Sequence, residues 1–141
     1  MRSKASQPRT ILPDPIYGDV MVSKLINRCL INGKKTVATR QIYAAFDLIK
    51  AAAGRDPLQV FTAALYNIRP QMEVRARRIG GAAYQVPTPV RGQRRDSLAI
   101  RWLVLAARNR PNREYHTFAD KLHAEILEAS NLAGGAVKKK L

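Results

Sequence analysis

The sequence is poor in cysteine and in acidic residues, and it lacks long hydrophobic runs. Its single cysteine, Cys29, cannot form an internal disulfide, which is consistent with a reducing compartment. No apolar stretch approaches the roughly 20 residues that a membrane-spanning helix needs. The N-terminal residues MRSKASQPR also lack the hydrophobic segment of a signal peptide. We therefore expect a cytoplasmic protein with no membrane partner.

The scarcity of acidic residues leaves a large excess of positive charge. Asp and Glu number 10 against 25 Lys and Arg, which gives a formal net charge of +15 over 141 residues. An excess of this size indicates a polyanionic partner, nucleic acid in the first place and an anionic membrane surface in the second. The 46% hydrophobic content is still sufficient for one folded domain with a buried core.

Side chains that carry catalysis or bind metals are few and scattered. His116 and His123 share one predicted helix, but Asp120 alone gives weak metal-ligand spacing, so we expect two surface histidines. Cys29 falls on an apolar helix face, where structural cysteines are buried and inert. Gly80-Gly81 lacks the GxxxxGK spacing of a phosphate-binding loop and is interpreted as a turn. With no carboxylate cluster or nucleophile–base motif, the sequence predicts no enzyme, no cofactor and no metal site.

Apolar periodicity and capping signals predict a mainly α protein with five helices. The helices are expected from Asp19 to Gly33, from about Thr36 to Ala53, from Asp56 to about Arg69, from Asp96 or Ser97 to Pro111, and from about Arg113 to Ala129. Their inward-facing residues are expected to be Val22, Leu25, Ile26 and Cys29; Ala38, Ile42, Ala45, Ile49 and Ala52; Leu58, Phe61, Leu65 and Ile68; Leu98, Trp102 and Leu105; and Tyr115, Phe118, Leu122, Ile126 and Ala129. Short links between helices favour a compact bundle.

A basic stretch from Met72 to Arg95 interrupts this helical pattern between the third and fourth helices. Its two halves alternate apolar and polar residues around Gly80-Gly81, which predicts a β-hairpin that protrudes from the bundle. Its arginines are Arg75, Arg77, Arg78, Arg91, Arg94 and Arg95, against the single acidic residue Glu73. Charge of one sign on a thin ribbon repels itself without an anion, and the arginine fork suits phosphate oxygens and base stacking. Tyr84, near the tip, is a further candidate for stacking.

The charge distribution and the apolar periodicity together predict three regions along the chain. Residues 11–131 form a single helical domain that contains the hairpin at 72–91, residues 1–10 a basic arm, and residues 132–141 a flexible basic tail. The arm carries Arg2, Lys4 and Arg9, and the tail carries Lys138, Lys139 and Lys140. Lys34 and Lys35 begin the second helix, where cations oppose the helix dipole, and this placement is reasonable if they face phosphate.

Six stretches of the sequence resemble the bacterial-type small-subunit ribosomal protein seven family. They are ILPDP at 11–15, NGKK at 32–35, NIRP at 67–70, EVRARRIGGAAYQVP at 73–87, LAIRW at 98–102 and GGAVKKK at 134–140. The resemblance implies a six-helix globule with a protruding β-ribbon, which binds the 3′ major domain of 16S ribosomal RNA and nucleates assembly of the subunit head. It also implies that the ribbon lies beside the exit-site transfer RNA and the messenger RNA path, and that neighbouring head and platform proteins are partners. The location implied is the ribosome, in the cytoplasm or in an organelle.

Family RNA contacts carry over to Lys34, Lys35, Arg75, Arg77, Arg78, Arg94, Arg95 and the N-terminal arm. Together with the other basic residues, the expected ribosomal RNA contacts are Arg2, Lys4, Arg9, Lys34, Lys35, Arg75, Arg77, Arg78, Arg91, Arg94, Arg95, Lys138, Lys139 and Lys140. The hairpin tip expected near transfer and messenger RNA is Arg78, Ile79, Gly80, Gly81, Ala82, Ala83 and Tyr84. Family members usually continue into a further helix, whereas this sequence stops at Leu141. The alternatives are an architectural DNA-binding protein that places the ribbon in a groove, and a nucleic-acid enzyme.

Overall fold

The computed structural model describes residues 11–79, 81–90 and 92–140 of the chain. Its helices are α1 (Val20–Cys29), α2 (Lys35–Ala53), α3 (Pro57–Ile68), α4 (Gln93–Arg108), α5 (Phe118–Ser130) and α6 (Gly135–Lys140), and its strands are β1 (Met72–Ile79) and β2 (Ala82–Pro89). The predominantly helical fold expected from the sequence is confirmed.

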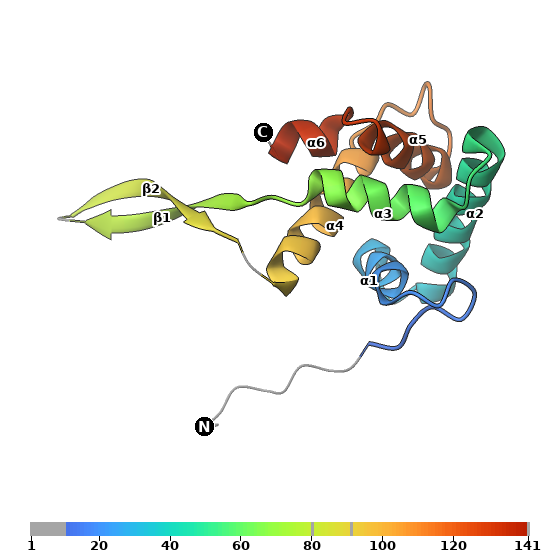
Figure 1. Ribbon diagram of the computed structural model, residues 1–141, viewed down its shortest axis with the longest axis horizontal. Helices are drawn as coiled ribbons and strands as arrows, with labels where there is room; N and C mark the ends of the chain where they lie inside the picture. The colour runs from blue at the N-terminus through green and yellow to red at the C-terminus, as the bar shows by residue number, and fades with distance from the viewer. Residues whose placement is uncertain (1–10, 80, 91, 141) are drawn as a thin grey trace.

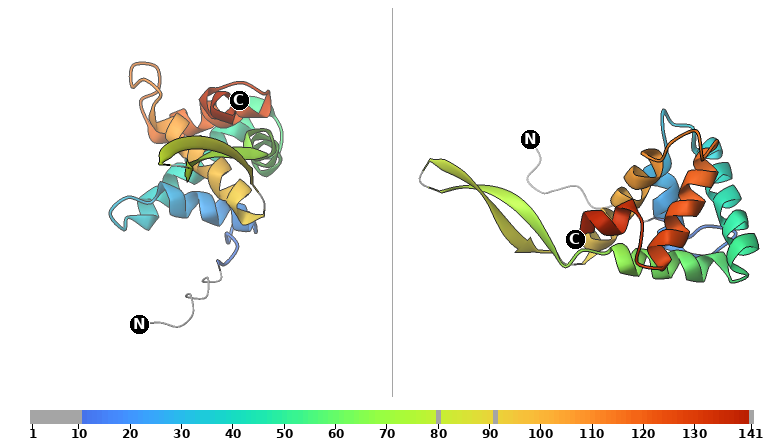
Figure 2. Two further views of the ribbon diagram at one scale, coloured as in Figure 1. Left: turned by 90° about the vertical axis from the view of Figure 1, so that its left-hand side faces the viewer. Right: turned by 90° about the horizontal axis from the view of Figure 1, so that it is seen from above.

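The helices pack into one body, and the two strands extend away from it (Figure 1). We call α1–α6 the body and the β1–β2 pair the ribbon. The strands are antiparallel, in a register that pairs Met72 with Pro89 and Ile79 with Ala82. At the base of the ribbon, the backbone N–H of Val90 donates to the carbonyl of Gln71 at 2.9 Å. Figure 2 shows from two further directions that the ribbon projects from one side of the body.

Local capping residues fix the starts of α1 and α3 as predicted. Asp19 Oδ1 accepts a hydrogen bond from the Met21 backbone N–H at 2.7 Å, and Asp56 Oδ1 accepts one from Leu58 at 3.2 Å. Pro57 is the first residue of α3, where its missing N–H is not needed. These capping interactions join residues close together in the chain, so they could be predicted from the sequence.

The core forms between the helices α1–α6, and α6 contributes Ala136 and Val137 to it. The expected inner face of α1 is confirmed, because Val22, Leu25, Ile26 and Cys29 are all buried. In α2, Phe46 was not among the residues expected to face inward, yet it is fully buried, and its ring centroid lies 5.4 Å from that of Phe61. Ala52 was expected to face inward and is exposed.

The predicted inner face of α4 is largely wrong. Leu98 is buried as expected, but Trp102 is only half-buried and Leu105 is 42% exposed. The rest of the buried face is Ala99, Ile100, Leu103, Val104 and Ala107. This row has the same helical spacing as the expected one but is rotated around the axis. This wider face is buried because α4 packs against four other helices, α1, α3, α5 and α6.

Two helix boundaries differ from the prediction because of the turns beside them. α1 ends at Cys29 and not at Gly33, since Leu30 is already extended. Asn32 and Gly33 both have positive φ, at 56° and 72°, and form the turn into α2 instead. α5 begins after Thr117 and not near Arg113, because the Thr117 side chain accepts the Asp120 backbone N–H at 3.2 Å.

α4 begins at Gln93, earlier than the predicted caps Asp96 and Ser97. Its N-cap is Gly92, which makes no side-chain hydrogen bond. Asp96 lies within the first turn and pairs with Arg69 Nε at 2.7 Å. This contact brings the carboxylate to the end of α3, so Asp96 joins two helices and does not cap one.

A flexible tail was expected at residues 132–141, but this expectation is wrong for Gly135–Lys140, which form the helix α6. Ala136 and Val137 are buried against the body. The Ala136 backbone N–H donates to Glu125 Oε1 at 2.9 Å, and Glu125 is only 1% exposed. A tertiary hydrogen bond and two buried side chains therefore hold this short helix in place. Leu141 lies outside the described residues.

Within the described residues, none of the helices is both long enough and apolar enough to span a bilayer.

Candidate nucleic-acid interface

Two of the acidic side chains, Asp14 and Glu125, are buried in the fold, and others cap helices. Asp14 is 3% exposed and accepts the Tyr43 hydroxyl at 2.7 Å together with the backbone N–H groups of Ile16 and Tyr17. Burial, followed by this hydrogen bond, raises the pKa of Tyr43 to about 12. Since Asp19 and Asp56 also serve as helix caps, these carboxylates do little to neutralise the surface.

Arg110 forms salt bridges with two acidic residues of α5, Glu125 and Glu128. Its Nη2 lies 2.7 Å from Glu125 Oε2 and its Nε 2.9 Å from the same oxygen, while Glu128 binds the same guanidinium. The Arg110 guanidinium also lies 5.2 Å from the centroid of the Tyr115 ring. This cluster joins the end of α4 to α5 and takes both carboxylates away from solvent-facing cations.

Other cations of the body lie on its surface. The exposed ones in the described residues are Arg28, Lys34, Lys35, Arg40, Lys50, Arg55, Arg94, Arg101, Arg108 and Arg113. An exposed cationic surface beside buried or bonded carboxylates gives the body a positive field, which attracts polyanions.

Lys34 and Lys35 stand at the start of α2, as the sequence predicts. Lys34 is the N-cap and makes no side-chain hydrogen bond to the helix, and Lys35 is the first helical residue. A cation at this end of a helix interacts unfavourably with the helix dipole, at a cost of roughly 0.3–1 kcal/mol for each cation. A bound phosphate would remove this unfavourable interaction, because it could accept from both the free N–H groups and the ammonium groups.

Arg95 and Arg94 lie in the first turn of α4, at the base of the ribbon. Arg95 is half-buried, and its Nε donates to the Pro70 carbonyl at 3.3 Å. Arg95 therefore ties α4 to the chain entering β1, a structural role that the sequence analysis did not foresee. Arg94 is exposed.

The arginines of the ribbon occupy defined positions in the strand register. Arg75 pairs with Val86, Arg77 with Tyr84 and Arg78 with Ala83. Arg78 and Tyr84 therefore lie close to the turn, and Arg75 lies nearer the body. Of the other expected contacts, Lys138, Lys139 and Lys140 belong to α6. Arg2, Lys4, Arg9, Gly80 and Arg91 lie outside the described residues.

The isolated reactive side chains behave as structural groups. Burial raises the pKa of the Cys29 thiol to about 11, although Arg108 acts in the opposite direction. A thiol with this pKa is neutral near pH 7 and a poor nucleophile. Burial lowers the pKa of His123. His123 lies in α5 whereas His116 precedes it, so the prediction that the two histidines share one helix is wrong. The described residues contain no group of three or more His, Cys, Asp or Glu that could hold a metal ion.

All 141 residues match one family model, residues 1–141 of the chain against the family described as ribosomal protein S7p/S5e. The chain belongs to the S7p/S5e family. It is 55% identical over 132 residues to the small ribosomal subunit protein uS7 of Carboxydothermus hydrogenoformans. The aligned region covers 94% of this chain and 83% of that relative. It is 52% identical to uS7 of Acetivibrio thermocellus, and this alignment covers 99% of this chain and 88% of the relative. For uS7 of Thermotoga neapolitana the identity is 51%, over the same shares of the two chains.

Membership of the S7p/S5e family confirms the resemblance found in the sequence. The relatives are named as proteins of the small ribosomal subunit and not as enzymes. The expectation that this chain is not an enzyme is therefore confirmed by its relatives.

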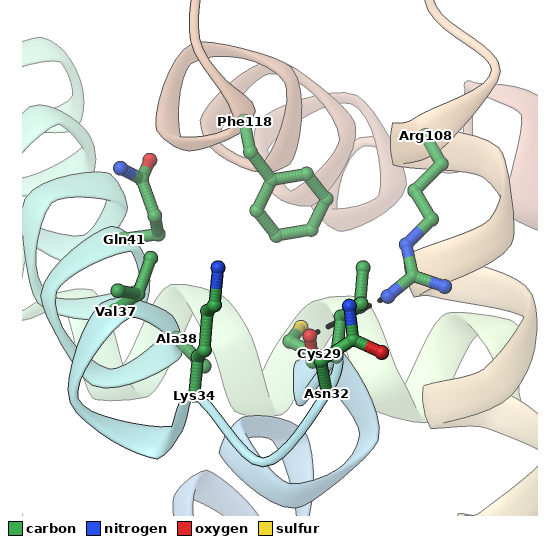
Figure 3. Close-up of a pocket in the computed structure, with 9 residues that line it drawn as sticks. Cys29, Asn32, Lys34, Val37, Ala38, Gln41, Arg108 and Phe118 are labelled. Carbon is green, nitrogen blue, oxygen red and sulfur yellow. Dashed lines mark hydrogen bonds between the residues drawn. The ribbon is translucent and has the colours of Figure 1, made fainter.

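One feature of this S7p/S5e chain has no signature in the sequence, the approach of Arg108 to the α1–α2 turn. Arg108 Nη2 donates to the Cys29 carbonyl at 3.4 Å. The two residues are far apart in the chain, so no local pattern joins them. Arg108 and Lys34 line the same cavity (Figure 3), so a second cationic site lies on the body, away from the ribbon.

Proposed function

We propose that this chain is a structural protein of the small ribosomal subunit that binds 16S ribosomal RNA through the cations of its body. The observation that carries the proposal is the excess of exposed cations on the body, since 25 Lys and Arg stand against 10 Asp and Glu and two of the carboxylates, Asp14 and Glu125, are buried. Family membership supplies the ribosomal context. In the finer form of the proposal, the chain binds the 3′ major domain, nucleates assembly of the head and contacts neighbouring head and platform proteins.

The helix termini support phosphate contacts on the body. The N-termini of α1, α3 and α5 are capped by the side chains of Asp19, Asp56 and Thr117. α2 and α4 begin at Lys34 and Gly92 without a side-chain cap. Both uncapped termini carry basic residues in or beside the first turn, so phosphate oxygens would find N–H donors and cations together.

The ribbon has a different part in the proposal. Its arginines and its distance from the body suit a reach beyond the primary RNA-binding surface, toward exit-site transfer RNA and messenger RNA. A protruding basic ribbon also favours the second candidate, an architectural DNA-binding protein with the ribbon in a groove. The two candidates differ in the nucleic-acid geometry that they bind, because the deep, narrow major groove of A-form RNA does not admit a ribbon as that of B-form DNA does.

The proposal is tested by measuring binding of the full chain to a transcript of the 3′ major domain of 16S ribosomal RNA across a salt series. A transcript of another domain and a DNA duplex of equal charge serve as competitors. We expect log K to fall with log salt by about 0.7–0.9 per phosphate contact, and the 3′ major domain to be preferred. A flat salt response would contradict the electrostatic mechanism, and stronger competition by the DNA duplex would favour the second candidate.

A further inference from the structure

A cavity of about 400 Å³ opens on the body where three segments meet (Figure 3). These segments are the α1–α2 turn with the first turns of α2, the end of α4, and the start of α5. The lining residues are Cys29, Ile31, Asn32, Lys34, Val37, Ala38, Gln41, Arg108 and Phe118. None of these lining residues is acidic.

The walls of the cavity are apolar and open to solvent. Ile31 is 57% exposed and Val37 is 51% exposed. The ring of Phe118, which is half-buried, projects between these segments (Figure 3). Leaving aliphatic surface in water is unfavourable by about 25 cal/mol per Å², so a ligand with an apolar face would be stabilised here.

Two cations stand at the edge of the same cavity. The Lys34 side chain extends toward Phe118, and Arg108 lies on the opposite side (Figure 3). The hydrogen bond from Arg108 Nη2 to the Cys29 carbonyl, at 3.4 Å, holds the guanidinium at this edge. An aromatic ring between two cations suits a flat ligand that carries negative charge beside its ring.

The cavity also offers polar groups to the edge of such a ligand. Gln41 Oε1 accepts the Ala119 backbone N–H at 3.0 Å, which fixes the side-chain amide and leaves its NH₂ group as a donor. Asn32, in the turn with a positive φ of 56°, contributes a second side-chain amide to the lining. A nucleobase has acceptors at its edge and two apolar faces, and both features match these walls.

We propose that this cavity receives one unpaired base of the bound RNA, with its ring against Phe118 and its flanking phosphates on Lys34 and Arg108. The inference rests on the proposed RNA-binding function and goes beyond phosphate contact. A base inside an A-form helix is stacked and paired and cannot enter such a cavity, whereas a bulged or loop base can. The cavity thereby selects for RNA structure, which charge alone does not do.

The test fills the cavity without changing its charge. Val37→Trp places a bulky side chain at the mouth, and Leu48→Trp is the control, since Leu48 lies on the same helix, is 37% exposed and does not line the cavity. Both variants are compared with the wild-type chain for affinity to the 3′ major domain transcript, with thermal unfolding as a check on folding. We expect Val37→Trp to lower affinity by about 5-fold to more than 100-fold, the range for loss of one stacked base, and Leu48→Trp to bind like wild type.

The salt series separates base insertion from phosphate contact. Val37→Trp should keep the wild-type salt slope because no cation is lost, whereas Lys34→Ala should reduce the slope by about one phosphate contact. Ultraviolet crosslinking of the wild-type complex should also join Phe118, which lines the cavity, to one unpaired nucleotide. If Val37→Trp binds as tightly as Leu48→Trp, or the crosslink maps to paired nucleotides, the cavity inference is wrong while RNA binding stands. If the wild-type chain does not bind the transcript, the proposed function itself fails.

Discussion

The body and the ribbon are held together by different interactions. In the body, side chains from α1–α6 form one buried cluster, in which Phe46 and Phe61 are at most 1% exposed. Within the described residues, β1 contacts β2, and neither strand makes a comparable set of contacts with a helix. An isolated two-stranded ribbon is marginal in water. The body therefore has a conformation of its own, whereas the ribbon depends on its base and on its partner.

The largest contrast between the two regions should appear in stability. Phe46→Ala removes a fully buried ring from the body and should lower the free energy of unfolding by about 3–5 kcal/mol. Replacing Ile79 to Ala82 with Asn-Gly shortens the ribbon and keeps a two-residue turn between the paired residues Arg78 and Ala83. It should change the free energy of unfolding by less than about 0.5 kcal/mol. Urea denaturation of both variants measures this. A large loss on shortening the ribbon would show that the body depends on it.

The second prediction applies the comparison to RNA binding. Replacing Arg94 and Arg95 by alanine removes cations beside rigid helices and should weaken binding to the 3′ major domain transcript by up to about 4 kcal/mol. The shortened ribbon should still bind this transcript but lose any contact with transfer or messenger RNA. Reconstituted subunits, tested for RNA binding and reading-frame maintenance, distinguish the two. Equal loss of RNA binding would mean that the whole ribbon is an anchor.

Cys29 provides a pH test of the body alone. Its pKa is raised by burial from 9.0 to about 11, so the neutral thiol stabilises the fold below pH 9. This stability is lost as the pH rises from 9 through 11, by about 2–3 kcal/mol, because the unfolded chain releases the proton first. The difference in unfolding free energy between wild type and Cys29→Ala, followed over this range, isolates the effect from the tyrosines. A difference that does not vary with pH would show that the thiol is more solvated than its burial indicates.

The smallest contrast lies within α4. Trp102 is half-buried, so Trp102→Ala should destabilise the body by about 1–3 kcal/mol, less than loss of a fully buried ring. Arg101 is exposed, and Arg101→Ala should change stability by less than about 0.5 kcal/mol. Thermal unfolding of the two variants checks this order. A Trp102→Ala effect as large as that of Phe46→Ala would place the indole in the core.

Elements set by neighbouring residues could be predicted from the sequence. Asp19 caps α1, Asp56-Pro57 begins α3, and Gly54 ends α2 with a positive φ of 66°, all within one helical turn of the features that they control. The apolar face of α1 is equally local, since its spacing alone defines it. For the candidate site, the position of Lys34 at the start of α2 was predicted for the same reason.

Features set by tertiary contacts could not be predicted. α6 depends on Glu125, a residue of α5 whose carboxylate no local pattern assigns to Ala136. The orientation of α4 depends on which of its faces meets α5 and α6, and helical spacing alone pointed to the row that contains Leu98, Trp102 and Leu105. The approach of Arg108 to Lys34 likewise arises only when α4 closes on the α1–α2 turn. RNA contacts of the ribbon and of the N-terminal arm remain predictions.

The hydrogen bond between Glu125 and the first turn of α6 has a consequence for the entropy of binding. A lysine run on a disordered tail loses backbone freedom when it meets RNA, at about 1–2 kcal/mol for each residue that becomes ordered. In this chain, the backbone of Gly135–Lys140 is already helical and fixed to α5 before any partner is present. Folding of the body has therefore already met this entropic cost. In the proposed complex, the segment that carries the last lysines would need no further ordering of its backbone.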